Sequence, residues 1–187
     1  RWYEDMTRPD LYFDRSAFLR VVKFSGMLKH FKGELAGQYI KLEAWQIFIV
    51  ANVFGWKRKA TGKRRYTYVD VFVPRKNGKT TFAAIIALFC MILDGEAGAE
   101  VYAAAVDREQ AKICFEASKE LIRGSMFERL VRLYTSSIVY GKAASSYKPL
   151  SKDSKNKDRA WEFMKWYTDK DFQVALSEEL ILLLGQS

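Results

Sequence analysis

The sequence predicts an α/β fold, in which a sheet is flanked by helices, and three observations support this prediction. Residues 66–73 are rich in aromatic and β-branched residues and stop at Pro74, which is typical of a strand. Residues 80–92 are apolar on nearly every side, as expected of a helix packed on a sheet, and Asp94-Gly95 predicts its end. A short apolar segment at 101–106, followed by an amphipathic pattern at 108–124, repeats the order of strand and helix. The apolar stripe available to face inward in this pattern is Ala111, Phe115, Ala117, Leu121 and Ile122.

The N-terminal part of the chain adds two helical patterns. Residues 1–14 are rich in aromatic and charged residues without periodicity, which predicts an irregular arm. Ser16 predicts a helix cap, and apolar residues at helical spacing follow it toward a predicted end near residues 32–33. A second helix is predicted to begin around Glu43 and to run toward Gly55.

The C-terminal part gives weaker patterns. Residues 134–140 predict another strand, whereas residues 143–157, which are rich in Ser and Lys, predict an exposed loop. Residues 158–187 predict a helical tail. We therefore expect two parts, a main unit at 1–157 and the tail at 158–187.

Composition narrows the class of protein. Of the 187 residues, 49% are hydrophobic, which is enough for one buried core. The longest apolar run, at 82–93, is shorter than the roughly 20 residues that cross a bilayer, and the first residues lack a signal-peptide pattern. We expect a soluble, cytoplasmic protein without a membrane partner. Cys90 and Cys114 lie in apolar segments without a C-x-x-C spacing, which favours buried small hydrophobes over a disulfide or zinc site.

The positive charge is unevenly distributed. The net charge is +9, and residues 1–80 contain 17 Lys and Arg against 7 Asp and Glu. A basic half can attract a polyphosphate or a nucleic-acid backbone. The basic runs at 57–59 and 63–65 flank Thr61-Gly62, which predicts a hairpin or loop tip. Both a solvated surface and a polyanion-binding surface remain open for these runs.

One loop has the residues that phosphate binding requires. Phosphate groups need converging backbone N–H donors, a helix N-terminus and a mobile cation, and residues 73–81 supply all three. Gly78 allows close approach of the backbone, and Lys79 can reach the β- and γ-phosphates. The Thr80 hydroxyl can bind magnesium at the start of the helix. Asn77 can adopt a left-handed conformation or bond locally.

This loop departs from the usual pattern, G-x-x-x-x-G-K-[ST], because Val73 stands at the first glycine position. A bare G-K-T triplet is common by chance. The predicted strand before the loop and the apolar helix after it form the arrangement that confirms such a motif. The context therefore favours nucleotide binding.

Several stretches, taken in order, resemble the large terminase subunits of tailed phages, in the branch whose phosphate loop reads P-R-K-N-G-K-[ST]. They lie within about residues 11–157 and are 30–37, 42–46, 73–81, 94–102 and 108–111. This family's loop commonly lacks the first glycine. The resemblance implies an incomplete P-loop NTPase-like sheet of the ASCE type, with a helical C-terminal segment. It also implies the ATPase of a viral DNA-packaging motor, which drives DNA into the capsid.

The resemblance assigns roles to individual residues. Lys79 and Thr80 would hold phosphate and magnesium, while Arg75 or Lys76 would add positive charge at the γ-phosphate. The implied cofactors are ATP and Mg²⁺. Lys79, Arg75 and Lys76 are the candidate catalytic residues, and Thr80 is the candidate metal ligand. The candidate nucleotide-binding residues are Trp45, Gln46, Pro74, Arg75, Lys76, Asn77, Gly78, Lys79, Thr80 and Thr81.

Three residues outside the loop have competing interpretations. Gln46 resembles the family's adenine-contacting glutamine and is preceded by Trp45. Composition alone instead favours Trp45 as helix core and Gln46 as its solvated neighbour. Gln110 resembles a position that couples ATP state to movement along DNA, but it also fits an ordinary helix surface.

Hydrolysis further needs an acidic residue near magnesium and a group that orients the attacking water. Asp107 follows an apolar segment and is the candidate, with Glu109 nearby. The resemblance places this segment before the Walker B strand, whose Asp-Glu pair is expected after Lys157 and is not found there. We expect a truncated, fused or rearranged chain without the family's nuclease domain, in which ATP binding survives and hydrolysis is doubtful.

The resemblance also implies partners, namely double-stranded DNA, a small terminase subunit, a portal protein and other copies of the chain on a capsid. The alternative is a non-catalytic remnant that binds nucleic acid or a partner subunit and lacks Walker B. Residues 158–187 do not fit the family and resemble a C-terminal helix of extracytoplasmic solute-binding proteins. A third possibility is therefore a solute-binding protein, and the absence of a signal-peptide pattern counts against it.

Overall fold

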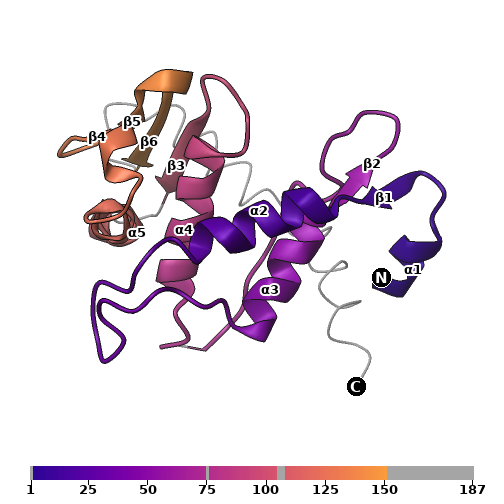
Figure 1. Cartoon of the computed structure of the whole chain (residues 1–187), viewed down its shortest axis with the longest axis horizontal. Coiled ribbons are helices and arrows are strands. Elements are labelled where there is room, and N and C mark those ends of the chain that lie inside the picture. The colour runs from indigo at the N-terminus through magenta and orange to yellow at the C-terminus, as the bar shows by residue number, and fades with distance from the viewer. Residues whose placement is uncertain (1, 75, 105–107, 151–187) are drawn as a thin grey trace.

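The structure is a computed structural model that describes residues 2–74, 76–104 and 108–150 (Figure 1). The predictions for Arg75, for Asp107 and for the tail at 158–187 lie outside these residues. Within the described ranges, no helix is long and apolar enough to span a bilayer. The elements, in chain order, are α1 (Trp2–Thr7), β1 (Leu11–Phe13), α2 (Arg15–Ser25), α3 (Ala44–Val50), the π-helix η1 (Ala51–Gly55), β2 (Trp56–Arg58), α4 (Lys79–Ile92), β3 (Glu100–Ala104), α5 (Arg108–Ile122), η2 (Glu128–Leu130), β4 (Val131–Leu133), β5 (Ile138–Tyr140), η3 (Gly141–Ala143) and β6 (Ser145–Leu150).

A mixed four-stranded sheet lies at one end of the molecule and has the order β3–β6–β5–β4 (Figure 1). β3, at one edge of this sheet, is parallel to β6, and this pairing places Glu100 opposite Ser146. The other two pairs are antiparallel. Helices α4 and α5 pack against each other, and both contact β3 and β6. The predicted α/β class, a sheet flanked by helices, is confirmed.

The two helices next to the sheet follow the sequence pattern closely. α4 begins at Lys79 and ends at Ile92, just before the predicted stop at Asp94-Gly95. Phe82, Leu88 and Phe89 are all buried in the core, as expected of a helix that is apolar on most sides. α5 turns its predicted apolar stripe inward. The five stripe residues are all buried and are Ala111, Phe115, Ala117, Leu121 and Ile122.

Strand β6, Ser145–Leu150, corrects the prediction of an exposed loop at 143–157 for its described part, and residues 151–157 of that range lie outside the described residues. Ser145 and Tyr147 are fully buried, and β6 lies in the middle of the sheet between β3 and β5. The Ser145 hydroxyl accepts a hydrogen bond of 3.1 Å from the Ala99 N–H, which satisfies polar groups in the interior. A serine whose hydroxyl has such a partner can occupy a central strand, although the Ser- and Lys-rich composition of this segment predicts a loop.

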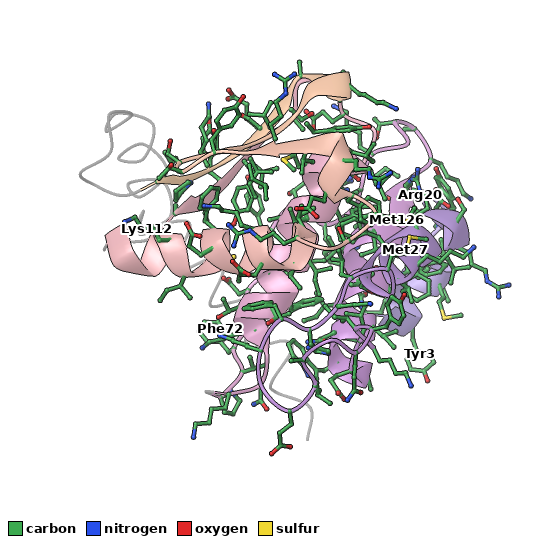
Figure 2. All side chains as sticks on the ribbon, turned by 60° about the vertical axis from the view of Figure 1, so that its left-hand side comes forward. Tyr3, Arg20, Met27, Phe72, Lys112 and Met126 are labelled. Carbon is green, nitrogen blue, oxygen red and sulfur yellow. The ribbon has the colours of Figure 1, made fainter. Side chains whose placement is uncertain are left out.

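The predicted strand at 66–73 is also wrong for the described residues. No residue in this range pairs with a described strand, and Val69 and Phe72, the latter labelled in Figure 2, are 47% and 77% exposed. Aromatic and β-branched residues favour an extended backbone, but a strand exists only where a neighbouring strand completes its hydrogen bonds. The predicted strand at 134–140 is partly confirmed, because β5 covers Ile138–Tyr140.

The N-terminal elements differ from the predictions at their ends. The predicted irregular arm contains α1 and β1, and β1 pairs antiparallel with β2. α2 is capped by Asp14, whose carboxylate accepts a 2.9 Å hydrogen bond from the Ala17 N–H, and not by the predicted Ser16. α2 ends at Ser25 instead of 32–33. The chain beyond Leu28 folds back on itself, as the 2.9 Å bond from the Ile40 N–H to the Leu28 carbonyl shows.

Aromatic side chains join these N-terminal helices to α4. The Phe24 ring of α2 lies 5.8 Å from the Phe89 ring, and the Phe54 ring of η1 lies 5.2 Å from it. Both are edge-on contacts, which favour a fixed geometry. Cys90, the next residue on α4, is a free, partly buried thiol packed against the core, and burial raises its pKa to about 11.

Asp14 links the helix cap to the β1–β2 ribbon, because Lys57 Nζ lies 2.7 Å from its Oδ2. We expect Asp14→Ala to lower the free energy of unfolding by at least the loss of the cap, about 1 kcal/mol. Asp14→Asn should keep the cap and lose only the ion pair, so its loss should be smaller. Urea denaturation of the three proteins measures both differences.

The same carboxylate predicts a pH dependence. The hydrogen bond from Lys57, followed by those from Ser16 and the Ala17 N–H, holds the pKa of Asp14 well below its usual range. The stability that it provides is therefore present above the unfolded pKa of about 4 and is lost as the pH falls through the folded pKa. The stability difference between the parent protein and Asp14→Asn should be constant above about pH 5. A difference that stays unchanged at lower pH would contradict this assignment.

Candidate functional site

The loop before α4 has a backbone suited to an anion. Gly78 caps the helix with φ 69°, in the left-handed region, and Lys76 also has a positive φ, of 71°. The first helical hydrogen bond, 2.9 Å long, runs from the Phe82 N–H to the Gly78 carbonyl. None of the described side chains caps this helix end. The N–H groups of the first turn are therefore available to a negative ligand, which the helix dipole also favours.

The side chains of this loop lie at the surface. Lys76, Asn77 and Lys79 are exposed, and Thr80 is half-buried at the first turn of α4. The Asn77 amide donates a long hydrogen bond of 3.4 Å to the Pro74 carbonyl, so it bonds locally. The two lysines can therefore reach a ligand at the helix end, and the Thr80 hydroxyl is fixed to the helix beside them.

Trp45 and Gln46, at the start of α3, lie next to this loop although they are far from it in sequence. The Trp45 ring contacts the Phe82 ring edge-on, with 5.4 Å between centroids. Gln46 is 8% exposed, and its Nε2 lies 4.0 Å from the position that a Cβ on Gly78 would occupy. The structure thus brings the start of α3 and the loop before α4 together. Gln46 is buried, which excludes the interpretation of a solvated neighbour.

The helix cap fixes which end of the Gln46 amide faces the loop. Gln46 Oε1 accepts a 3.0 Å hydrogen bond from the Glu43 N–H. The oxygen is therefore used within α3, and the NH₂ group is directed toward Gly78. A fixed donor beside the loop can bind an acceptor atom of a ligand, such as a ring nitrogen or a phosphate oxygen.

Ion pairs hold the chain segment that leads into the loop. Arg64 pairs with Asp94 just beyond α4. On the other side, the Arg65 guanidinium lies 2.9 Å from Asp5 Oδ1, and the Tyr66 hydroxyl donates a 2.7 Å hydrogen bond to Asp5 Oδ2. Burial, reinforced by the bond to Asp5, raises the pKa of Tyr66. Arg64 and Arg65, which are adjacent in the chain, therefore pair with aspartates from two different parts of the fold.

Sequence reasoning missed Asp5, which is only 1% exposed. The acidic residue stands in a segment that carries no periodicity, and its partners are about 60 residues away in the chain. The uncompensated positive charge of 63–65 was the only available indication that carboxylates must lie nearby.

Several predicted residues cannot be placed in the site. Arg75 and Asp107 lie outside the described residues. Gln110 belongs to α5, but its side chain is not among those described. The described side chains contain no group of three or more His, Cys, Asp or Glu positioned to hold a metal ion.

Comparisons with known proteins add an independent finding. A family model described as "Terminase large subunit, ATPase domain" matches residues 44–162. Among solved structures, the fold is similar to that of the HK97 bacteriophage large terminase, with a TM-score of 0.59 and 23% sequence identity. The match covers 74% of this chain and 28% of that one, so the chain spans under a third of the length of the solved protein. No curated protein sequence matches the chain.

Proposed function

The chain belongs to the family of terminase large subunit ATPase domains, and from this premise we propose that it binds ATP with Mg²⁺ in a phage DNA-packaging motor. Its role would be to power translocation of double-stranded DNA into a capsid. In that setting its partners would be DNA, a small terminase subunit, a portal protein and further copies of the chain, in the host cytoplasm.

The observation that supports nucleotide binding most directly is the uncapped start of α4. Gly78 turns the backbone into the helix, and exposed Lys79 stands at the first position. We assign Lys79 to the β- and γ-phosphates, and Lys76, with Arg75, to the charge on the γ-phosphate. Pro74, Asn77 and Thr81 complete the loop around the phosphates.

The opposite wall of the proposed site is the start of α3. The Gln46 NH₂ group faces the loop and is held by its own cap, so it can donate to an acceptor on adenine. Trp45 packs on Phe82, which fixes the distance between α3 and α4. We therefore propose that Gln46 contacts the base and that Trp45 supports it.

Magnesium fits the donors at the helix start. Mg²⁺ in nucleotide sites is held by substrate phosphates and one or two protein oxygens rather than by a cage of carboxylates. The Thr80 hydroxyl, half-buried at the first turn, is such an oxygen. When bound, the ion would offset charge on the phosphates. Asp107 remains the candidate for a second protein ligand.

ATP binding and ATP turnover measured on the same sample test this function. We expect a labelled ATP analogue with Mg²⁺ to bind the 187-residue chain saturably, and unlabelled ATP to displace it. Absence of saturable binding would contradict the proposal and favour a non-catalytic module that binds DNA or a partner. We expect turnover to be weak. Rapid hydrolysis that ends in Asp107→Asn would instead assign the Walker B role to Asp107.

A further inference from the structure

Residues 56–65 comprise strand β2 and the turn that follows it, and an isolated bridge between Lys57 and Arg64 closes this turn. We call residues 56–65 the basic ribbon, because six of them are Lys or Arg and none is acidic. A 2.9 Å hydrogen bond from the Arg58 N–H to the Lys63 carbonyl joins its two sides. Gly62, at the tip, has φ 66°, in the left-handed region that glycine favours. Figure 1 shows that β2 and the loop that follows it lie at the end of the molecule away from the four-stranded sheet.

Three cations of the basic ribbon are already neutralised. Each forms an ion pair with an aspartate from another part of the chain. The exposed fractions are 19% for Lys57, 32% for Arg64 and 15% for Arg65. Their role is therefore to hold the ribbon on the domain. The pairs are Lys57 with Asp14, Arg64 with Asp94, and Arg65 with Asp5.

The other three cations lie closer to the tip and are exposed. Within the described part of the chain, no ion pair or hydrogen bond is formed by the side chains of Arg58, Lys59 and Lys63. Asp10 is close to them, since its carbonyl accepts a 2.9 Å bond from the Lys59 N–H. Its carboxylate, however, is held by Arg8 through hydrogen bonds of 3.0 and 2.7 Å. The tip therefore carries three cations without a fixed counter-charge.

We propose that Arg58, Lys59 and Lys63 bind the phosphate backbone of duplex DNA without regard to its sequence. The Arg58 N–H donates to the Lys63 carbonyl, and Lys59 is next to Arg58 in the chain, so three long side chains start from one small area. Between the cations the tip is Ala60-Thr61-Gly62, which offers little to read base edges.

The chemistry of the tip favours DNA over an acidic protein. Protein interfaces depend on buried aromatic or large apolar anchors, and residues 58–63 contain none. Phosphate contacts need only cations and polar groups. Lys63 and Arg20 also line a neighbouring cleft of about 520 Å³. That cleft contains Asp94 and Glu96 as well, so its mixed charge suits a polyanion less than the tip does.

This surface is separate from the proposed nucleotide site. Arg64 of the ribbon is anchored at Asp94, beyond the C-terminal end of α4, whereas the phosphate loop lies at the N-terminal end. A helix of 14 residues is about 20 Å long, so α4 separates the anchor of the ribbon at Asp94 from the loop at Gly78. The inference rests on the proposed function only for the choice of duplex DNA as the polyanion.

The test is the salt dependence of DNA binding. The affinity of the full chain for a short labelled duplex is measured by fluorescence anisotropy, without nucleotide, between about 50 and 200 mM salt. Each phosphate contact contributes a slope of about −0.9 in a plot of log affinity against log salt. We expect the triple variant Arg58→Ala, Lys59→Ala, Lys63→Ala to lose about 3 units of slope, equally for unrelated DNA sequences.

The matched control removes the same charge at the sheet end of the molecule. Arg129, Arg132 and Lys142 are exposed, and their triple alanine variant should keep the slope. Equal losses in the two variants, or an unchanged slope in the ribbon variant, would overturn the proposal. Lys79→Ala should keep the DNA slope even if ATP binding fails, which separates this inference from the proposed function. A thermal unfolding midpoint equal to that of the parent protein confirms that the fold of the ribbon variant is intact.

Discussion

Lys79→Ala is expected to weaken binding of an ATP analogue with Mg²⁺ by about 10- to 100-fold, because a hydrogen bond to a charged group contributes about 1.5–3 kcal/mol. Lys79 is the first residue of α4 and is exposed at the uncapped helix end. Alanine favours a helix, so the loop geometry should survive the change. Titration of a fluorescent analogue measures the loss.

Lys142→Ala is the matched control for this change. Lys142 is also an exposed lysine, but it belongs to η3 beside the sheet. Its replacement by alanine removes the same charge at a place far from the loop. Its affinity for the analogue should equal that of the parent protein. Lys79→Arg should bind with intermediate strength, because arginine keeps the charge but has a different shape. If Lys79→Ala and Lys142→Ala bind equally well, the loop does not hold the phosphates.

Asp5→Ala should have the largest effect on stability, a loss of about 3 kcal/mol in the free energy of unfolding. Asp5 is 1% exposed and is the ion-pair partner of Arg65, which is itself only 15% exposed. The two groups are 2.9 Å apart, and buried Arg65 Nε has no acceptor among the described residues. Removal of the carboxylate would therefore leave a largely buried guanidinium without a counter-charge, and the Tyr66 hydroxyl without its acceptor. Urea denaturation measures the loss.

A second variant separates the lost pair from general damage to the arm. In the double variant Asp5→Ala, Arg65→Met, the buried charge is absent, so part of the lost stability should return. Asp10→Ala is the control on the surface, since Asp10 is exposed and should leave the unfolding midpoint unchanged. If the double variant is as unstable as Asp5→Ala, the unpaired guanidinium is not the cause.

Asp5→Ala also tests whether α1 steadies the segment that leads into the phosphate loop. Tyr66, which Asp5 holds, is eight residues before Pro74 in the chain. We expect a reduced affinity for ATP in this variant even under conditions where it is fully folded.

Predictions that depend on local pattern were the most successful. The clearest case is α4, which begins at Lys79 directly after the turn at Gly78 and ends at Ile92 as the apolar run 80–92 predicts. Phosphate binding by the loop before it stays a prediction. The stripe of α5 was confirmed at each of its five positions, since a periodicity of 3.6 residues determines which face is buried. The start of α3 at Glu43 was also confirmed.

Failures arose where a partner distant in sequence decides the structure. Residues 66–73 have the composition of a strand but no described strand to pair with. The segment that contains Ser145 has the composition of a loop but forms β6, inside the sheet. Helix α2 was predicted too long, because the return of the chain at Ile40 ends it. The boundary at residue 157 stays a prediction, since it lies outside the described residues.

The sequence by itself determined helices α4 and α5 and the excess of positive charge, and it predicted the phosphate loop before α4. Only the tertiary structure decided how that charge is used, because carboxylates from three separate elements neutralise Lys57, Arg64 and Arg65 and leave Arg58, Lys59 and Lys63 exposed. The physical reason is range. Backbone preference and apolar periodicity act between neighbours in the chain, whereas ion pairing and strand pairing depend on residues that only folding brings together.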